Sequence, residues 1–224
     1  MEQIAKPTST ERAILVLSLA GALGALLLFS WLAEEIFQGE LLRFDQQVRV
    51  AIHQHASPWL TTLMKVVTKL GSAWFIISLL VVVVLLFLRM GWRRAATWMA
   101  LSVAGSALLD GTLKAAFHRA RATPFFGALP LSYSFPSGHA LTSFCFYGVL
   151  AGLLTARIRN RYARGLIWVA AAVLVAAIGI SRIYLGVHWP TDVIAGYAAA
   201  AVWVGGLLTV YRWRRYRVSR TITF

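Results

Sequence analysis

The chain has 224 residues, of which 59% are hydrophobic and only 13% are charged, and its mean hydropathy is +0.69. Soluble domains carry about 25% charged residues, so this composition excludes an ordinary soluble domain. A net charge of +14 would suggest a nucleic-acid partner for a soluble protein, but in a membrane protein the placement of the charges decides their meaning.

Six stretches without charged residues are candidates for membrane-spanning helices. A hydrocarbon core of about 30 Å needs about 20 apolar helical residues, and fewer suffice where one end lies in protein or water. The stretches leave no room for a separate soluble domain. We therefore predict an all-α polytopic membrane protein with six transmembrane helices, in one domain over residues 1–224. The stretches are 13–33, 70–88, 95–109, 140–156, 165–180 and 193–211.

The first stretch is expected to be a retained transmembrane helix and not a cleaved signal peptide. Lys6 and Arg12 before it resemble the basic start of a signal peptide. The apolar run is longer than such a signal usually has, however, and Leu32-Ala33-Glu34-Glu35 makes a poor cleavage site. We predict short cytoplasmic ends, about 1–12 and about 212–224, the latter a basic tail that is disordered or in contact with lipid.

Arginine and lysine gather between alternate stretches. Short loops rich in these residues stay cytoplasmic, so six spans place both termini inside. The 34–69 segment lacks this bias, and its part 57–69 is predicted to form an amphipathic helix at the outer interface, with Gly71-Ser72 as the bend into the next helix. The basic clusters are Lys6 and Arg12; Arg89, Arg93 and Arg94; Arg157, Arg159, Arg161 and Arg164; and Arg212, Arg214, Arg215, Arg217 and Arg220.

Ionisable side chains remain near the predicted outer ends of helices three to six. Such groups are costly at membrane depth and are functional candidates. Their gathering at one face predicts a site there. They are Asp110, Lys114, His118, Arg119, Arg121, His139, Arg182, His188 and Asp192.

The types and spacing of these residues favour an anionic ligand. Lys114 and Arg121 lie two helical turns apart, near one face if the helix continues that far. Pro136-Ser137-Gly138-His139 starts the fourth helix, with Ser137 as a preferred N-cap. Free N–H groups at a helix start bind anions, and His139 lies within reach of the same anion. Arg182 adds a third cation.

His188 and Asp192 are separated by one helical turn. At this spacing the carboxylate can accept a hydrogen bond from one imidazole nitrogen and leave the other free as a nucleophile or base. Alone, such a pair is more often structural. Together with three cations, a helix start and a second histidine, it suits phosphoryl transfer. Those cations would repel a metal ion, so we predict neither a metal nor a cofactor.

Three blocks of the sequence together resemble the signature of the type 2 phosphatidic acid phosphatase (PAP2) superfamily, in its bacterial membrane lipid phosphatase branch. They are Lys114-x6-Arg121, Pro136-Ser137-Gly138-His139 and Ser181-Arg182-x5-His188-x3-Asp192. The blocks stand in the family's order, and the six-helix layout extends the likeness over nearly the whole chain. The family's first block commonly ends in Arg-Pro, whereas Ala122 follows Arg121 here. Without proline, the loop loses one fixed φ angle but no charge.

The resemblance implies a PAP2-like helical bundle and a metal-independent hydrolase acting on a lipid phosphate monoester or diphosphate. His188 would attack phosphorus and form a phosphohistidine, Asp192 would orient it, and His139 would protonate the leaving oxygen and then activate water. The lipid would enter laterally from the bilayer at the extracytoplasmic face, and no nucleic acid is involved. The phosphate would be held by Lys114, Arg121, Arg182 and the backbone at Ser137 and Gly138.

Several points stay open. Asp110 either pairs with Lys114 or makes an interhelical polar contact. His118 and Arg119 either contact a second phosphate or face water, and the second is favoured because they lie at a helix end. The substrate is undecaprenyl diphosphate, phosphatidylglycerophosphate, phosphatidate or a lipid A phosphate, and the oligomeric state is not encoded in these patterns. A lipid phosphotransferase or a non-enzymatic anion carrier would share the cationic cluster, whereas a haloperoxidase is disfavoured by the membrane composition.

The basic-loop pattern predicts that cysteines introduced near Gln47 and near Asn160, in a Cys145→Ser background, are labelled from opposite sides of the membrane. An impermeant thiol reagent applied to intact cells and to inverted vesicles measures this. Labelling of both positions from one side would contradict the six-span topology.

Overall fold

The structure, a computed structural model, describes residues 9–128 and 130–221, and in these ranges it is helical with no strand, as predicted. Residues 1–8, which include Lys6, lie outside the described part. In chain order the helices are α1 (Ser9–Gln38), α2 (Leu42–His53), α3 (Pro58–Lys69), α4 (Ala73–Arg89), α5 (Arg93–Phe117), α6 (Gly138–Ser143), the π-helix η1 (Phe144–Gly148), α7 (Val149–Thr155), α8 (Arg161–Tyr184) and α9 (Pro190–Thr221).

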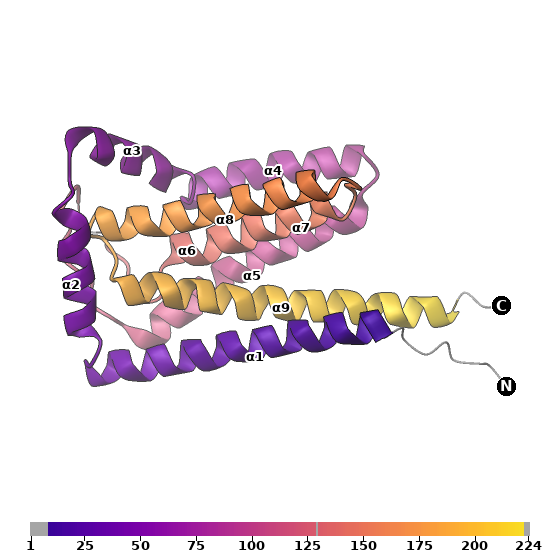
Figure 1. Cartoon of the computed structure of the whole chain (residues 1–224), viewed down its shortest axis with the longest axis horizontal. Helices are drawn as coiled ribbons and strands as arrows, with labels where there is room; N and C mark the ends of the chain where they lie inside the picture. The colour runs from indigo at the N-terminus through magenta and orange to yellow at the C-terminus, as the bar shows by residue number, and fades with distance from the viewer. Residues whose placement is uncertain (1–8, 129, 222–224) are drawn as a thin grey trace.

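The long helices form a bundle that is closed at one end by α2 and α3 (Figure 1). α1 packs along α9, and α4 packs along α5. The start of α1, the end of α9 and the α4–α5 and α7–α8 connections lie together at the opposite end. The elements that carry the described basic clusters therefore meet at one end of the bundle, as the loop pattern predicts.

Within the described ranges, four helical segments are long and apolar enough to cross a membrane: Val16–Gln38, Gly138–Thr155, Arg161–Tyr184 and Pro190–Arg212. The pair α3 and α4, bent by 49°, provides a fifth candidate if it counts as one span. α5 has 25 residues but is not apolar enough to be one of these candidates. Asp110 and Lys114 near its end, with interior glycine, serine and threonine, lower its hydropathy. The six-span count therefore stays a prediction.

The closed end was only partly predicted. α3 begins after Ser57, whose Oγ accepts a hydrogen bond from the Leu60 N–H, and the bend before α4 falls at Gly71-Ser72, both as expected. α2 was not predicted as a helix. The residues that α2 buries are Asp45 and Arg49, so the face that it turns inward is polar and gives no apolar periodicity.

The predicted fourth helix is a continuous rod of α6, η1 and α7, with a π-helical turn that its sequence did not indicate. The C-terminal prediction needs correction. α9 continues as a helix through Thr221, so the basic segment from Arg212 to Thr221 is helical and not disordered. Its contact with lipid stays a prediction, and residues 222–224 lie outside the described part. No proline follows Pro190 in this helix, and Gly205-Gly206 alone does not end it.

Close approach of α5 and α9 gives a stability prediction. A Cβ at Gly105 would lie 1.9 Å from Cζ2 of Trp203, whose Nε1–H donates to the Ser102 carbonyl at 3.1 Å. We expect Gly105→Ala to displace the indole and to lower the free energy of unfolding by roughly 1–3 kcal/mol. Thermal unfolding in detergent measures it.

Gly111→Ala is the matched control, because no atom lies within 4 Å of a Cβ at this position of the same helix. Alanine favours a helix interior by about 1 kcal/mol over glycine, so this variant should be unchanged or slightly more stable. Equal melting temperatures for the two variants would contradict the packing.

Candidate active site

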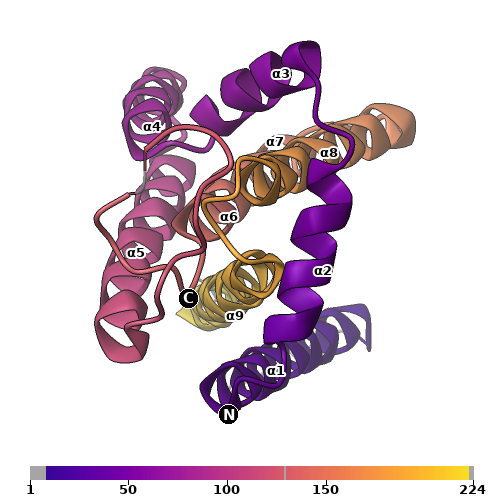
Figure 2. The same cartoon turned by 90° about the vertical axis from the view of Figure 1, so that its left-hand side faces the viewer.

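The predicted site residues meet at the closed end of the bundle. They come from the end of α5, the 118–137 loop, the start of α6, the end of α8 and the α8–α9 turn (Figure 2). These segments are held together by backbone hydrogen bonds. The Ser137 N–H donates to the Asp192 carbonyl at 2.9 Å, and the Ser134 N–H donates to the Arg119 carbonyl at 2.9 Å.

His188 and Asp192 lie in contact, both fully buried, but not on one helix face as expected. His188 precedes α9, which begins at Pro190. The Asp192 carboxylate folds back over the helix start and accepts the Trp189 N–H at 2.9 Å, as the acidic residue of a capping box does. The same oxygen, Oδ2, lies 3.4 Å from Nδ1 of His188. The helix start thus brings the pair together.

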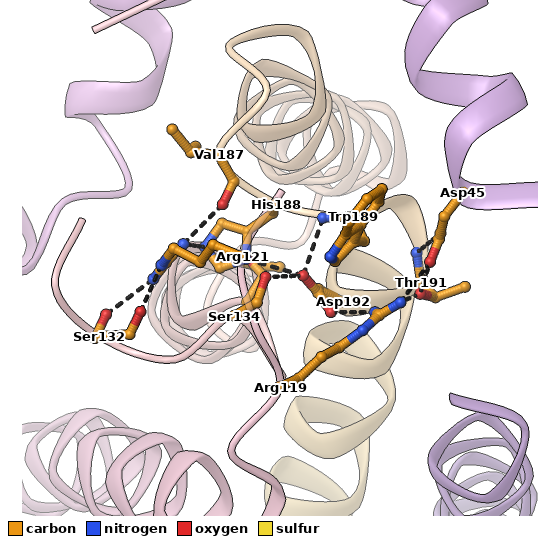
Figure 3. A network of polar contacts seen from close by, with 12 residues as sticks. Asp45, Arg119, Arg121, Ser132, Ser134, Val187, His188, Trp189, Thr191 and Asp192 are labelled. Carbon is orange, nitrogen blue, oxygen red and sulfur yellow. Dashed lines mark hydrogen bonds and ion pairs between the residues drawn. The ribbon is translucent and has the colours of Figure 1, made fainter. Parts of the chain in front are cut away.

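The contacts of His188 define its tautomer (Figure 3). Nη1 of Arg121 lies 3.0 Å from Nε2 of His188, and a guanidinium only donates. Nε2 therefore carries the lone pair, and the proton lies on Nδ1 toward Asp192. Burial lowers the pKa of His188 to about 4, the contact with Asp192 counteracts this in part, and the charges of Arg182 and Arg121 lower it further.

Arg121 is fixed by the loop that carries it. Its Nε and Nη2 donate to the carbonyl and hydroxyl oxygens of Ser132 at 2.6 and 2.8 Å, and Nη1 also donates to the Val187 carbonyl at 2.8 Å. Burial lowers the pKa of Arg121, against the attraction of Asp192 and Asp110. An arginine nonetheless stays charged, since its ordinary pKa is far above neutral.

Arg182, on α8, has a buried donor without a partner, and its charge acts on both histidines. Its Nη1 donates to Oγ1 of Thr68 at 2.8 Å, while its Nε is buried without a hydrogen-bond partner. The charges of Arg182, Lys114 and Arg121 all act on His139. These three cations and His188 therefore lie near His139, and their joint role in one site stays a prediction.

The start of α6 has the predicted cap. Oγ of Ser137 accepts the Ala140 N–H at 3.5 Å. Asp110 pairs with Lys114 at 2.8 Å, which resolves the alternative left open above. A Cβ at Gly138 would lie 2.7 Å from Oδ1 of Asp110, so only glycine allows this ion pair to lie against the start of α6.

The expectation that Arg119 faces water is wrong. Its side chain is 13% exposed and lies between two buried carboxylates, Asp45 and Asp192. Helix-end arginines commonly reach solvent, but here the 118–137 loop folds back over the α9 start. His118 is exposed, as expected, and its ring contacts Tyr133.

Ser134, Asp45 and Thr68 contact the predicted residues and were not found from the sequence. Ser134 donates its hydroxyl hydrogen to Oδ2 of Asp192. None of the three stands in a motif, and their partners lie far away in the chain. No group of three or more His, Cys, Asp or Glu side chains in metal-binding geometry occurs in the described ranges. Metal independence stays a prediction.

Comparison with known proteins agrees with this arrangement. A family model described as "PAP2 superfamily" matches residues 95–217. The phosphatidylglycerophosphatase B of Bacillus subtilis (strain 168) is 33% identical over 178 residues, which cover 77% of this chain and 85% of that protein. An undecaprenyl-diphosphatase of Sulfolobus acidocaldarius is 40% identical over 78 residues, or 35% of this chain and 33% of that protein.

A solved structure resembles the fold. It is the crystal structure of a transmembrane PAP2-type phosphatidylglycerolphosphate phosphatase from Bacillus subtilis, with a TM-score of 0.76 and 28% identity, covering 88% of this chain and 96% of that one. The apolar helices and these membrane relatives make the protein a multi-pass membrane protein. With a family match over more than half of its length and a similar relative over most of both proteins, the chain belongs to the PAP2 superfamily, among its membrane phosphatases.

Proposed function

We propose that this protein hydrolyses a lipid phosphate monoester or diphosphate without a metal, through a phosphohistidine at His188. The observation that carries the proposal is the pair of contacts on His188: Nδ1 faces Asp192, and the lone pair of Nε2 faces Arg121. A neutral, oriented imidazole is the state that can attack phosphorus. Its depressed pKa keeps it neutral at physiological pH.

The reaction has two steps. Nε2 of His188 attacks phosphorus, the bond to the leaving oxygen breaks, and that oxygen takes a proton from the protonated ring of His139, which becomes neutral. His139 then takes a proton from water as the water oxygen attacks the phosphohistidine, which releases inorganic phosphate and the free imidazole. Asp192 stabilises the positive charge that develops on the ring of His188 during attack.

The phosphate would be bound by Arg121, Arg182, Lys114 and the backbone of Ser137 and Gly138. The unpartnered Nε of Arg182 supports this role, since a buried donor without an acceptor costs free energy until an anion arrives. When the phosphate binds, the Nη1–H of Arg121 would donate its hydrogen bond to an equatorial phosphate oxygen instead of to Nε2 of His188. The lone pair of Nε2 is then free for attack. Such fixed donors stabilise transition-state charge.

The substrate would enter from the bilayer, and we place the site at the extracytoplasmic face of one domain over 1–224, with six crossings. The start of α1 and the end of α9 lie at one end of the bundle, which requires an even number of crossings. α5 has 25 residues, or about 38 Å of helix, enough for the sixth. The relatives favour phosphatidylglycerophosphate or undecaprenyl diphosphate as the lipid.

The proposed function predicts different effects for the loss of each histidine. Removal of a general acid costs roughly 10²–10⁴-fold, and less when the leaving group is a good one. His139→Ala should therefore keep measurable activity on an activated aryl phosphate and lose it on a lipid phosphomonoester, whereas His188→Ala should be inactive on both. Phosphate release measures this.

Rapid quenching with labelled substrate should trap an acid-labile, base-stable phosphoenzyme in the wild type and not in His188→Ala. An adduct in His188→Ala, or inactivity of His139→Ala alone on the aryl phosphate, would reverse the two assignments.

The second prediction concerns metals. Because cations line the site where a metal would need ligands, phosphate release should survive EDTA. Vanadate, which mimics a pentacoordinate phosphorus, should inhibit it. Loss of activity in EDTA that Mg²⁺ or Zn²⁺ restores would refute metal independence.

A further inference from the structure

Asp45, in the first turn of α2, is a fully buried carboxylate that lies outside the segment matched by the family model. It accepts the Thr191 N–H at 2.9 Å and the Thr191 hydroxyl hydrogen at 2.7 Å, both at the start of α9. It also accepts from Nη2 of Arg119 at 2.7 Å. A buried charge is costly without such partners, so this carboxylate is held by a built environment.

Arg119 connects Asp45 to the site. Its Nη1 donates to Oδ1 of Asp192 at 2.5 Å, while Nη2 is bound to Asp45 (Figure 3). Both nitrogens belong to one rigid planar group, so the position of one carboxylate sets the direction of the N–H bond toward the other. The Trp189 ring, whose centroid lies 5.5 Å from Cζ of Arg119, limits movement out of this plane.

The two oxygens of Asp192 have separate partners. Oδ1 is bound to Arg119, and Oδ2 lies toward Nδ1 of His188. Rotation of the carboxylate would exchange or misalign these oxygens. The contact with Arg119 resists that rotation, and Asp45 in turn resists movement of Arg119.

We propose that Asp45 is a positioning residue for the reaction, which acts through Arg119 to hold the Asp192 carboxylate in the orientation that directs His188. This rests on the proposed function, because it presupposes attack by His188. Arg119 is not a ligand for a second phosphate, since both of its terminal nitrogens are bound to carboxylates and the side chain is largely buried. Helix α2 is thereby coupled to the proposed nucleophile.

The test begins with Asp45→Asn. Asparagine keeps one oxygen for the Thr191 N–H, but its NH₂ group donates and cannot accept from Nη2 of Arg119 or from the Thr191 hydroxyl. Because Asp45 does not touch the substrate, we expect kcat to fall about tenfold while KM changes by less than about twofold. Glu40→Gln removes the same charge from an exposed side chain just before α2 and should leave kcat unchanged.

The decisive measurement repeats Asp45→Asn in an Asp192→Asn background. A residue that acts through Asp192 has nothing left to orient there, so Asp45→Asn should cause no further loss of kcat. A purely structural role would lower kcat by the same factor in both backgrounds and would overturn the proposal. Wild-type kcat in Asp45→Asn would also overturn it.

If Asp45→Asn does not fold, Arg119→Lys can take its place in the same comparison with and without Asp192→Asn. It keeps the charge but cannot bind both carboxylates in one plane, so it should lower kcat alone and add nothing to Asp192→Asn. Failure of the proposed function can be distinguished from failure of the positioning role. It would appear as full activity in Asp192→Asn or a phosphoenzyme in His188→Ala, whereas failure of the positioning role alone leaves both of those variants impaired.

Discussion

The carboxylate of Asp192 is fully buried and accepts hydrogen bonds from Arg119, Ser134, Trp189 and His188. A buried anion is tolerated only when donors replace the water that it has lost. These donors come from the loop after α5 and from the α8–α9 turn. The segments that build the site are therefore joined by the same anion that the proposed reaction uses, so folding of this end and assembly of the site are one event.

The surrounding charges suit His188 to the role of nucleophile that we propose for it. Burial and the nearby arginines lower the pKa of His188 to about 4, although Asp192 opposes this. The imidazole is thus neutral at physiological pH, and its remaining proton lies on Nδ1. The same arginines that disfavour a charged ring would favour an incoming phosphate. One arrangement of cations therefore serves both binding and the protonation state of the nucleophile.

The sequence predicted the parts of the site that rest on spacing within one segment. The Ser137 cap and the His188–Asp192 contact each join residues three or four positions apart, as does the Asp110–Lys114 pair, which was one of two alternatives left open. Residues at this separation meet within a helical turn, as Asp110 and Lys114 do, or across a helix start, where the Asp192 carboxylate folds back toward Trp189 and His188. The long apolar helices were predictable for the same reason, since hydropathy is read along one stretch of chain.

Contacts between distant segments were not predictable in this way. Asp45 and Arg119 are separated by 74 residues, and nothing in either local sequence indicates that they meet. Arg119 in particular looks like a helix-end cation that reaches water, and only the fold of the loop reveals its burial. α2 was missed because its inward face is polar, so a method based on apolar periodicity reads it as a loop.

The loop after α5 shows how tertiary contacts replace a local constraint. The family's usual proline after Arg121 would fix one φ angle, and Ala122 does not. Here the Phe125 and Phe126 N–H groups donate to the Leu185 carbonyl at 3.1 and 3.3 Å, and Arg49 donates to the Thr123 carbonyl at 2.7 Å. These bonds attach both the α8 end and α2 to the loop. The contacts that hold the loop with Arg121 beside His188 therefore come from α2 and the α8 end rather than from the residue next to Arg121.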